Sequence, residues 1–230
     1  MVLPAGSLGI GGEDFAEMNW GMVHGPDDVA DAVRRFGERL RARTLPGVVG
    51  VSSEVASAAH AVAGELGLVA EAPWPMMTCG ASEHRPAVVR DAGADPRATR
   101  VSDAATLAAA CDVMGAGFGL AGWQCGNMLG PRFLEQADAD LFLATLEGVP
   151  AAVAGTGRVG DFVGVYAVAT APELRRRGAA SAAVSAAIAH HRDRGAQLFG
   201  LMASEAGAPV YGKLGFATVE LTPVWAVAAT

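Results

Sequence analysis

The chain has 230 residues, of which 51% are hydrophobic and 18% are charged, so it can build a sizeable buried core and is not an intrinsically disordered protein. Its net charge of −7 excludes a general nucleic-acid-binding protein, which needs a basic face. No stretch approaches the roughly 18 apolar residues of a membrane span.

Cysteine usage and the opening residues bear on the compartment. Cys79, Cys111 and Cys125 show no C-x-x-C spacing, which is typical of free thiols in a reducing compartment and gives no zinc pattern. The opening MVLPAGSLGIGG has no basic segment and no long apolar run, so no signal peptide is expected. Residues 1–12 could be native or an expression leader. We expect a cytoplasmic protein without a metal, and the single lysine, Lys213, suggests a high-GC bacterial source.

The first part of the chain alternates helices and strands after residues 1–20, which show no periodicity. Asp27 and Asp28 are expected to begin a helix, followed by a strand at GVVGVSS, a helix that ends at Gly67 and a strand at WPMMTC. Residues 80–97 are polar and contain Pro and Gly, so they are predicted to be a linker.

The second part predicts a meander followed by a strand–helix–strand pattern. Asp103 is expected to cap a helix, and the runs DLFLATL, VPAAVAG and DFVGVYAVAT then predict three antiparallel strands. A helix reaching Gly195, a strand at QLFGLMAS, a short helix at GAPVYGKLG and a final strand at TPVWAVA complete the chain. This order predicts an α+β fold with a mixed sheet flanked by helices.

An internal echo suggests a duplication. GVVGVSSE…ELGL…PWPMMTC parallels LFGLMASE…KLGF…TPVWAVA. Either the N-terminal part is a partial duplicate of the C-terminal part, or two ordinary strand–helix–strand units share their turn chemistry. We predict an N-terminal half over residues 1–95 and a second domain over residues 96–230.

The segment GTGRVG, residues 155–160, matches the glycine fingerprint of dinucleotide-binding proteins. That fingerprint requires a helix immediately afterwards, whereas the residues that follow are β-branched and aromatic. We interpret it as a hairpin turn, which leaves little support for a nucleotide-binding oxidoreductase.

The segment ELRRRGAAS, residues 173–181, predicts an anion site. Gly178 allows a sharp turn, and the helix that follows has first-turn N–H groups without intrahelical partners. Those groups and the helix dipole favour a phosphate, while three arginines at a helix start would be unfavourable without an anion. The buried face of this helix is predicted to contain Ala180, Val184, Ala187, Ile188 and His191. The alternative is a solvated basic turn.

Two motifs resemble the GCN5-related N-acetyltransferase (GNAT) family. VATAPELRRRGAA, residues 168–180, is similar to its strand end followed by [RQ]-x-x-G-x-[GA], and APVYGKLGF, residues 208–216, is similar to its Y-x-K-L-G-F signature. The likeness covers residues 97–230. The N-terminal half has Ala63 where Tyr211 would fall and no R-x-x-G-x-A pattern, so we expect it to be a degenerate, non-catalytic GNAT-like half.

The resemblance implies where acyl-CoA would bind. A wedge would open between the strand ending at Thr170 and the strand near residues 197–204, and the pantetheine arm would lie there. The residues implied for cofactor binding are those of the strand end, the arginine turn and the loop after the second strand: Val168, Ala169, Thr170, Arg175, Arg176, Arg177, Gly178, Ala179, Ala180, Ser181 and Ser204.

The resemblance also implies that Tyr211 is catalytic. A phenol with a reference pKa of about 10 can protonate a thiolate whose conjugate acid lies near 8.5. The alternative is a half-buried tyrosine packed beside Phe216. The general base stays open, because Asp161, Glu147 and Glu205 are each expected to be surface acids and water-relayed deprotonation is equally open.

The predicted function is acyl-CoA-dependent N-acyl transfer from acetyl-CoA to a primary amine in a ternary complex. The acceptor would be a small molecule or a peptide, contacted by the loop that contains Phe118 and Trp123, although these two could instead close the core. The alternative is a non-catalytic acyl-CoA-binding sensor. No nucleic acid or membrane is expected as a partner, and homodimerisation stays open.

Overall fold

The computed structural model describes residues 1–10, 16, 19–25, 27–87, 96–121, 124–126 and 129–227. The chain forms two compact units: Met1–Met76 with Val219–Thr230, and Met77–Thr218. We refer to them as unit 1 and unit 2. The boundaries between the units fall inside two strands, β6 (Trp74–Gly80) and β12 (Ala217–Thr222). The boundary predicted from the sequence lies between residues 95 and 96.

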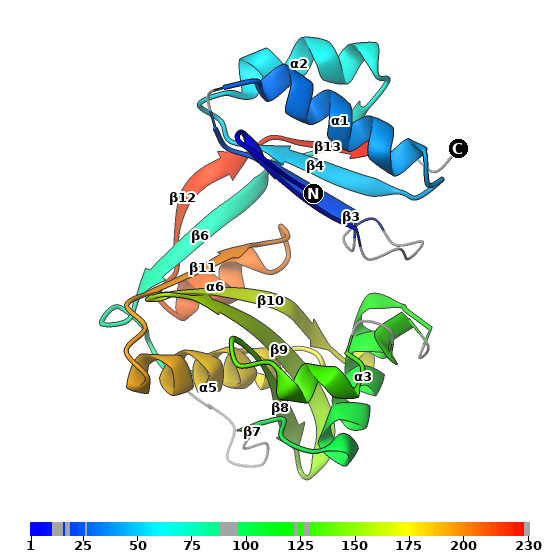
Figure 1. The fold of residues 1–230 in the computed structure, drawn as a ribbon. Coiled ribbons are helices and arrows are strands. Elements are labelled where there is room, and N and C mark those ends of the chain that lie inside the picture. The colour runs from blue at the N-terminus through cyan, green and yellow to red at the C-terminus, as the bar shows by residue number, and fades with distance from the viewer. Residues whose placement is uncertain are drawn as a thin grey trace. The chain divides into compact units, whose positions relative to one another are not determined.

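Unit 1 is a six-stranded sheet with two helices (Figure 1). The strand order is β1-β2-β3-β4-β13-β5. The elements are β1 (Val2–Leu3), β2 (Gly6–Ile10), β3 (Asn19–Val23), α1 (Val29–Arg41), β4 (Gly47–Val51), α2 (Ala56–Glu65), β5 (Val69–Ala70) and β13 (Val224–Val227). Strands β1 to β3 were not predicted, because they are short and rich in glycine.

The core of unit 1 lies beneath α1. Val29, Val33, Phe36 and Leu40 recur at helical spacing and are all buried. Asp28 stands at the N-cap position, but its side chain makes no capping hydrogen bond. From the C-terminal end of the chain, Trp225 and Val227 of β13 join this core.

Unit 2 is built on a seven-stranded sheet of order β12-β6-β11-β10-β9-β8-β7, in which β6 and β12 continue from unit 1. Its other elements are β7 (Arg97–Arg100), α3 (Ala104–Phe118), a 3-10 turn at Pro131–Glu135, β8 (Ala139–Leu146), β9 (Val149–Val159), β10 (Phe162–Thr170), a 3-10 turn at Pro172–Leu174, α5 (Ala179–Asp193), β11 (Leu198–Met202) and α6 (Ala208–Lys213). The predicted meander is present as β8, β9 and β10, which pair antiparallel.

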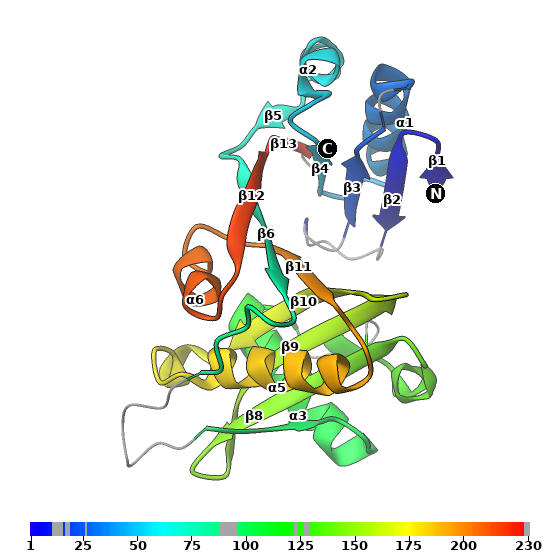
Figure 2. The same cartoon turned by 90° about the vertical axis from the view of Figure 1, so that its left-hand side faces the viewer.

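Helices cover both faces of this sheet (Figure 2). Alternate residues of β9 point to opposite faces, so Ala152 and Ala154 pack in the cluster under α5, whereas Val153 packs in the cluster with α3. The side chain of Asp103 caps α3, as predicted, by accepting a 2.8 Å hydrogen bond from the amide of Thr106. The buried face of α5 is as predicted except at Ala180, which is half-buried, while Ala179 and Ala183 are buried.

The segment GTGRVG is not a turn. Strand β9 runs through Val159, and the turn to β10 is at Gly160 and Asp161, with φ +63° at Gly160. The prediction of a hairpin turn over the whole segment was therefore wrong, because Gly155 and Gly157 pair with β10. The dinucleotide interpretation fails for the expected reason, since a strand follows and not a helix.

The sheets of the two units share one topology. In β1-β2-β3-β4-β13-β5 and in β8-β9-β10-β11-β6-β12, the first two adjacent pairs are antiparallel and the third pair is parallel. A helix, α1 or α5, connects the two strands of each parallel pair. This agreement supports the predicted duplication. No helix in the described part of the chain is long and apolar enough to cross a membrane.

Candidate active site

A wedge opens between β10 and β11. The two strands pair in parallel only at Phe162, Val163 and Gly164, opposite Leu198, Phe199 and Gly200. Beyond Gly164, β10 continues to Thr170 without a residue opposite it on β11, and Figure 1 shows the two strands separating. The wedge expected at this place is therefore present.

A β-bulge turns β10 away from its neighbour. The register with β9 shifts between Tyr166 and Ala169, and Ala167 has φ +48°. A bulge inserts one residue and bends the strand that contains it. The backbone groups of β10 that face the wedge, from Val165 to Thr170, thus form a sheet edge inside the unit, and an edge of this kind can pair with an extended ligand.

The arginine turn brings a row of backbone amides to the end of β10. After the 3-10 turn, Arg176 and Gly178 have φ +64° and +84°, and α5 begins at Ala179. In the described part of the chain, none of the six amides from Arg176 to Ser181 donates to a protein acceptor, whereas the next amide, of Ala182, bonds to the carbonyl of Gly178 at 3.0 Å. Consecutive free amides at a helix start form an anion site.

The three arginines have different surroundings. Arg175 donates to the carbonyl oxygens of Thr170 and Gly117 at 3.3 and 3.0 Å, so it fixes the turn to the end of β10 and to α3. Arg177 pairs with Glu147 at 2.7 Å. Arg176 is exposed and has no ion pair or side-chain hydrogen bond within the described residues. Of the three, Arg176 is the guanidinium that remains for an anion.

Tyr211 lies on α6, packed against the core of unit 2. Its ring is edge-on to Phe216, with ring centroids 6.0 Å apart. Burial raises the pKa of Tyr211 to about 12. The phenol therefore stays protonated at neutral pH, which a proton donor requires. Ser204 accepts a 3.1 Å hydrogen bond from the amide of Gly207, so its hydroxyl supports the loop that leads into α6.

The carboxylates considered as bases are on the surface. Glu147, Asp161 and Glu205 are all exposed, and Glu147 is paired with Arg177. Strand β10 itself contains no acidic residue. A buried carboxylate base is therefore not evident at the wedge among the described residues, and the identity of the base stays open between a surface acid and a water relay.

Aromatic residues on β10 were missed by sequence reasoning. The ring of Tyr166, which is 53% exposed, lies across Gly164 and Gly157, and Phe162 lies across Gly200. The signal was the alternation of β10, which puts residues 162, 164 and 166 opposite the buried Val163 and Val165. Phe118 is exposed at the end of α3, and Trp123 lies outside the described residues.

Comparison with known proteins agrees with this geometry. Residues 133–219 match the family described as acetyltransferase (GNAT) domain, a range that includes the wedge, the arginine turn and Tyr211. Over this range the chain is similar to GNAT acetyltransferase domains. A comparison with curated proteins finds no match.

Solved GNAT structures share the fold over most of the chain. A GCN5-related N-acetyltransferase from Kribbella flavida is 21% identical with a TM-score of 0.67, and the match covers 93% of this chain and 82% of that one. One from Sphaerobacter thermophilus is 14% identical with a TM-score of 0.64, covering 90% and 72%. A tandem GNAT protein from the clavulanic acid biosynthesis pathway is 12% identical with a TM-score of 0.61, covering 92% and 75%. The GNAT fold is thus shown for this chain.

Proposed function

We propose that the protein is an N-acyltransferase that transfers an acetyl group from acetyl-CoA to a primary amine by direct attack in a ternary complex. The observation that carries this proposal is the open wedge between β10 and β11, which leads to six unpaired amides at the start of α5. An extended amide chain fits the first feature and a pyrophosphate fits the second.

We propose that the cofactor residues predicted at the end of β10 and at the arginine turn line this path. Val168, Ala169 and Thr170 end β10, and Thr170 also accepts the bond from Arg175. The amides of Arg176, Arg177, Gly178, Ala179, Ala180 and Ser181 would hold the pyrophosphate, and the Arg176 side chain would add charge. Gly178 has its αL conformation without a side-chain penalty, which keeps the turn open to the phosphate.

The chemistry requires three things of the protein. Strand amides at the wedge would polarise the thioester carbonyl. A new C–N bond forms as the neutral amine attacks, the C–S bond breaks, and the thiolate takes a proton from Tyr211, which regains a proton from water. The amine loses its proton to water, because β10 offers no carboxylate. No enzyme nucleophile is needed, so Cys111 and Cys125 have no role in transfer.

Unit 1 is proposed not to bind a cofactor. Strands β3 and β4 pair without interruption from Trp20 opposite Val48 to Val23 opposite Val51, so no wedge opens. Asp27 and Asp28 precede α1 where unit 2 has arginines, and carboxylates at this place would repel a phosphate. We expect one acetyl-CoA per chain, measured by titration calorimetry; two would contradict the assignment of unit 1.

An acyl-CoA sensor without catalysis is the second candidate. The lack of a carboxylate on β10 favours it, whereas the protonated Tyr211 favours an enzyme. Release of free thiol from acetyl-CoA, scanned over small amines and peptides, separates the two. Turnover with any amine supports the enzyme. Tight binding with no thiol release supports the sensor, and no binding at all contradicts both.

A further inference from the structure

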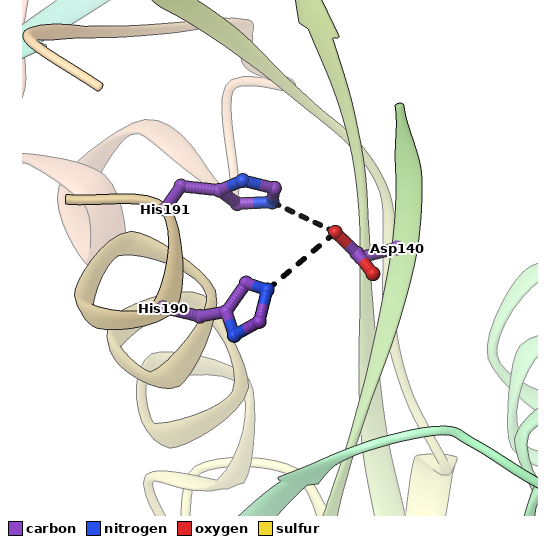
Figure 3. A group of neighbouring side chains, drawn as sticks. All are labelled: Asp140, His190 and His191. Carbon is purple, nitrogen blue, oxygen red and sulfur yellow. Dashed lines mark ion pairs between the residues drawn. The ribbon is translucent and has the colours of Figure 1, made fainter. Parts of the chain in front are cut away.

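A carboxylate and two imidazoles meet beneath the C-terminal end of α5. Asp140 lies near the start of β8 and is 4% exposed, and His191, in the last turn of α5, is 1% exposed. His190 precedes it, with 28% of its side chain exposed. Figure 3 shows both rings pointing to the same oxygen of Asp140. The cluster therefore joins a helix and a strand that are fifty residues apart in sequence.

The separations in this cluster differ from those of hydrogen bonds. His191 Nε2 and His190 Nε2 lie 3.4 and 3.8 Å from Asp140 Oδ2, and the three atoms are all within 4.8 Å of one another. An N–H···O hydrogen bond spans roughly 2.7–3.2 Å. Ligand atoms that share a tetrahedral ion at about 2.0–2.1 Å are about 3.4 Å apart. The spacing fits a shared ion better than shared protons.

The hydrogen bonds around the cluster leave two of the three proposed ligand atoms, His190 Nε2 and Asp140 Oδ2, available for an ion. His190 Nε2 is buried and has no hydrogen-bond partner among the described residues. Arg100 pairs through Nε with Asp140 Oδ1, which orients the carboxylate and leaves Oδ2 facing the rings. A ligating carboxylate is usually held by a hydrogen bond from behind, as Arg100 holds Asp140. The Thr156 hydroxyl forms a 2.8 Å hydrogen bond with His191 Nε2, which an ion on that nitrogen would displace.

Two features would weaken the affinity of this cluster for a cation. Arg100 adds positive charge beside the ion, and the buried His191 Nδ1 has no partner in the described part of the chain, whereas ligating histidines normally donate from this nitrogen.

We propose that Asp140, His190 and His191 form a binding site for a divalent transition-metal ion, zinc(II) foremost. Two imidazoles and one carboxylate are a ligand set that suits zinc. The cysteine pattern alone had predicted no metal. From Ala179 to His191, α5 rises about 18 Å at about 1.5 Å per residue, so the ion would lie far from the arginine turn. Its role would be to fasten the end of α5 to β8.

The test uses the full-length chain with any affinity tag removed, because a histidine tag binds metal itself. After dialysis against a chelator, zinc(II) is titrated calorimetrically at pH 7.5, and cobalt(II) is added separately to follow its visible absorption. The variants are His190→Gln, Asp140→Asn and, as a matched control for surface binding, His60→Gln. His60 is an exposed histidine on α2.

We expect one zinc ion per chain and a rise in thermal midpoint. His190→Gln should weaken binding more than about tenfold, since even outer-shell changes cost 10–100-fold, and His60→Gln should leave it unchanged. Asp140→Asn should abolish binding; if that variant fails to fold, His190→Gln decides alone, because its side chain is partly exposed. The proposal is overturned if the wild type binds no zinc, or if binding survives His190→Gln unchanged. Neither outcome depends on acyl transfer, so failure of the metal-site proposal and failure of the proposed function can be told apart.

Discussion

Replacement of Tyr211 by phenylalanine tests the proposed proton donor most directly. The edge-on contact with Phe216 needs only the ring, so Tyr211→Phe removes the hydroxyl and keeps the packing. With a pKa of about 12 against about 8.5 for the thiol, full proton transfer is uphill by about 3.5 units, or about 4.8 kcal/mol. General acid catalysis usually contributes a rate factor of about 10²–10⁴, and an acid this weak should contribute a factor at the lower end. We therefore expect kcat to fall about 10²-fold in Tyr211→Phe.

The assay is thiol release from acetyl-CoA with a saturating amine. The KM for acetyl-CoA should change little, because the hydroxyl is proposed to act on the leaving thiolate. Since the donor must be protonated and its pKa is about 12, the wild type should show no alkaline loss of kcat from this group up to about pH 11. The chain has only two tyrosines, so Tyr166→Phe is the matched comparison. If Tyr211→Phe retains more than half of the wild-type kcat, the assignment of the acid is wrong; a larger loss in Tyr166→Phe would transfer the role to that residue.

Three further changes probe the turn and the stability of unit 2. Arg176→Ala should raise the KM for acetyl-CoA about five- to tenfold, which corresponds to the loss of about 1–1.4 kcal/mol of attraction between surface charges. The difference in KM between variant and wild type should shrink in high salt, and an unchanged KM at low salt would contradict a phosphate contact. Gly178→Ala forces a side chain to φ +84° and should cost about 1–2 kcal/mol of stability, measured by urea unfolding, with weaker acetyl-CoA binding; an unchanged midpoint would show that the turn relaxes. Burial, and to a lesser extent Arg192, lowers the pKa of His84 from its ordinary value of 6.5. Below pH 6.5 the unfolded chain therefore takes up a proton at His84 more readily than the folded chain does, and the stability of the fold decreases as the pH falls. His84→Gln should reduce the loss of stability between pH 7 and pH 5, and an identical loss in both proteins would exclude His84 as its source.

Local chemistry made much of unit 2 predictable. Asp103 is a capping residue whose side chain reaches an amide three positions on, and the turns of the meander have left-handed residues at Glu147, Gly148 and Gly160 where the sequence places breaks. The pairing of distant strands was not predictable in this way. β13 pairs with β4, and β6 lies beside β11, so each closing strand joins a sheet that its local sequence cannot identify.

The site was predictable only in part. The arginine turn and Tyr211 stand in contiguous motifs, so the resemblance identified them. The separate surroundings of Arg175, Arg176 and Arg177 depend on partners 30 or more residues away, such as Gly117 and Glu147. The cluster of Asp140, His190 and His191 was invisible, because adjacent histidines on a helix have no metal-binding spacing of their own and their carboxylate is on another element.

The two units differ in whether the two strands of their parallel pair separate: β10 and β11 of unit 2 separate, whereas β3 and β4 of unit 1 do not. Apart from β7, which occurs only in unit 2, the two sheets have the same order, and in both a helix connects the parallel pair. In unit 1 that pair stays joined to the last residue of β3, whereas in unit 2 one bulged residue near Ala167 accompanies the separation of β10 from β11. Where the strands separate, arginines precede the helix, whereas aspartates precede it where the strands stay paired. An open edge without a ligand leaves backbone groups unpaired, and the unpaired helix amides follow the end of the same strand. The proposed binding of a single extended anion would therefore satisfy both sets of groups.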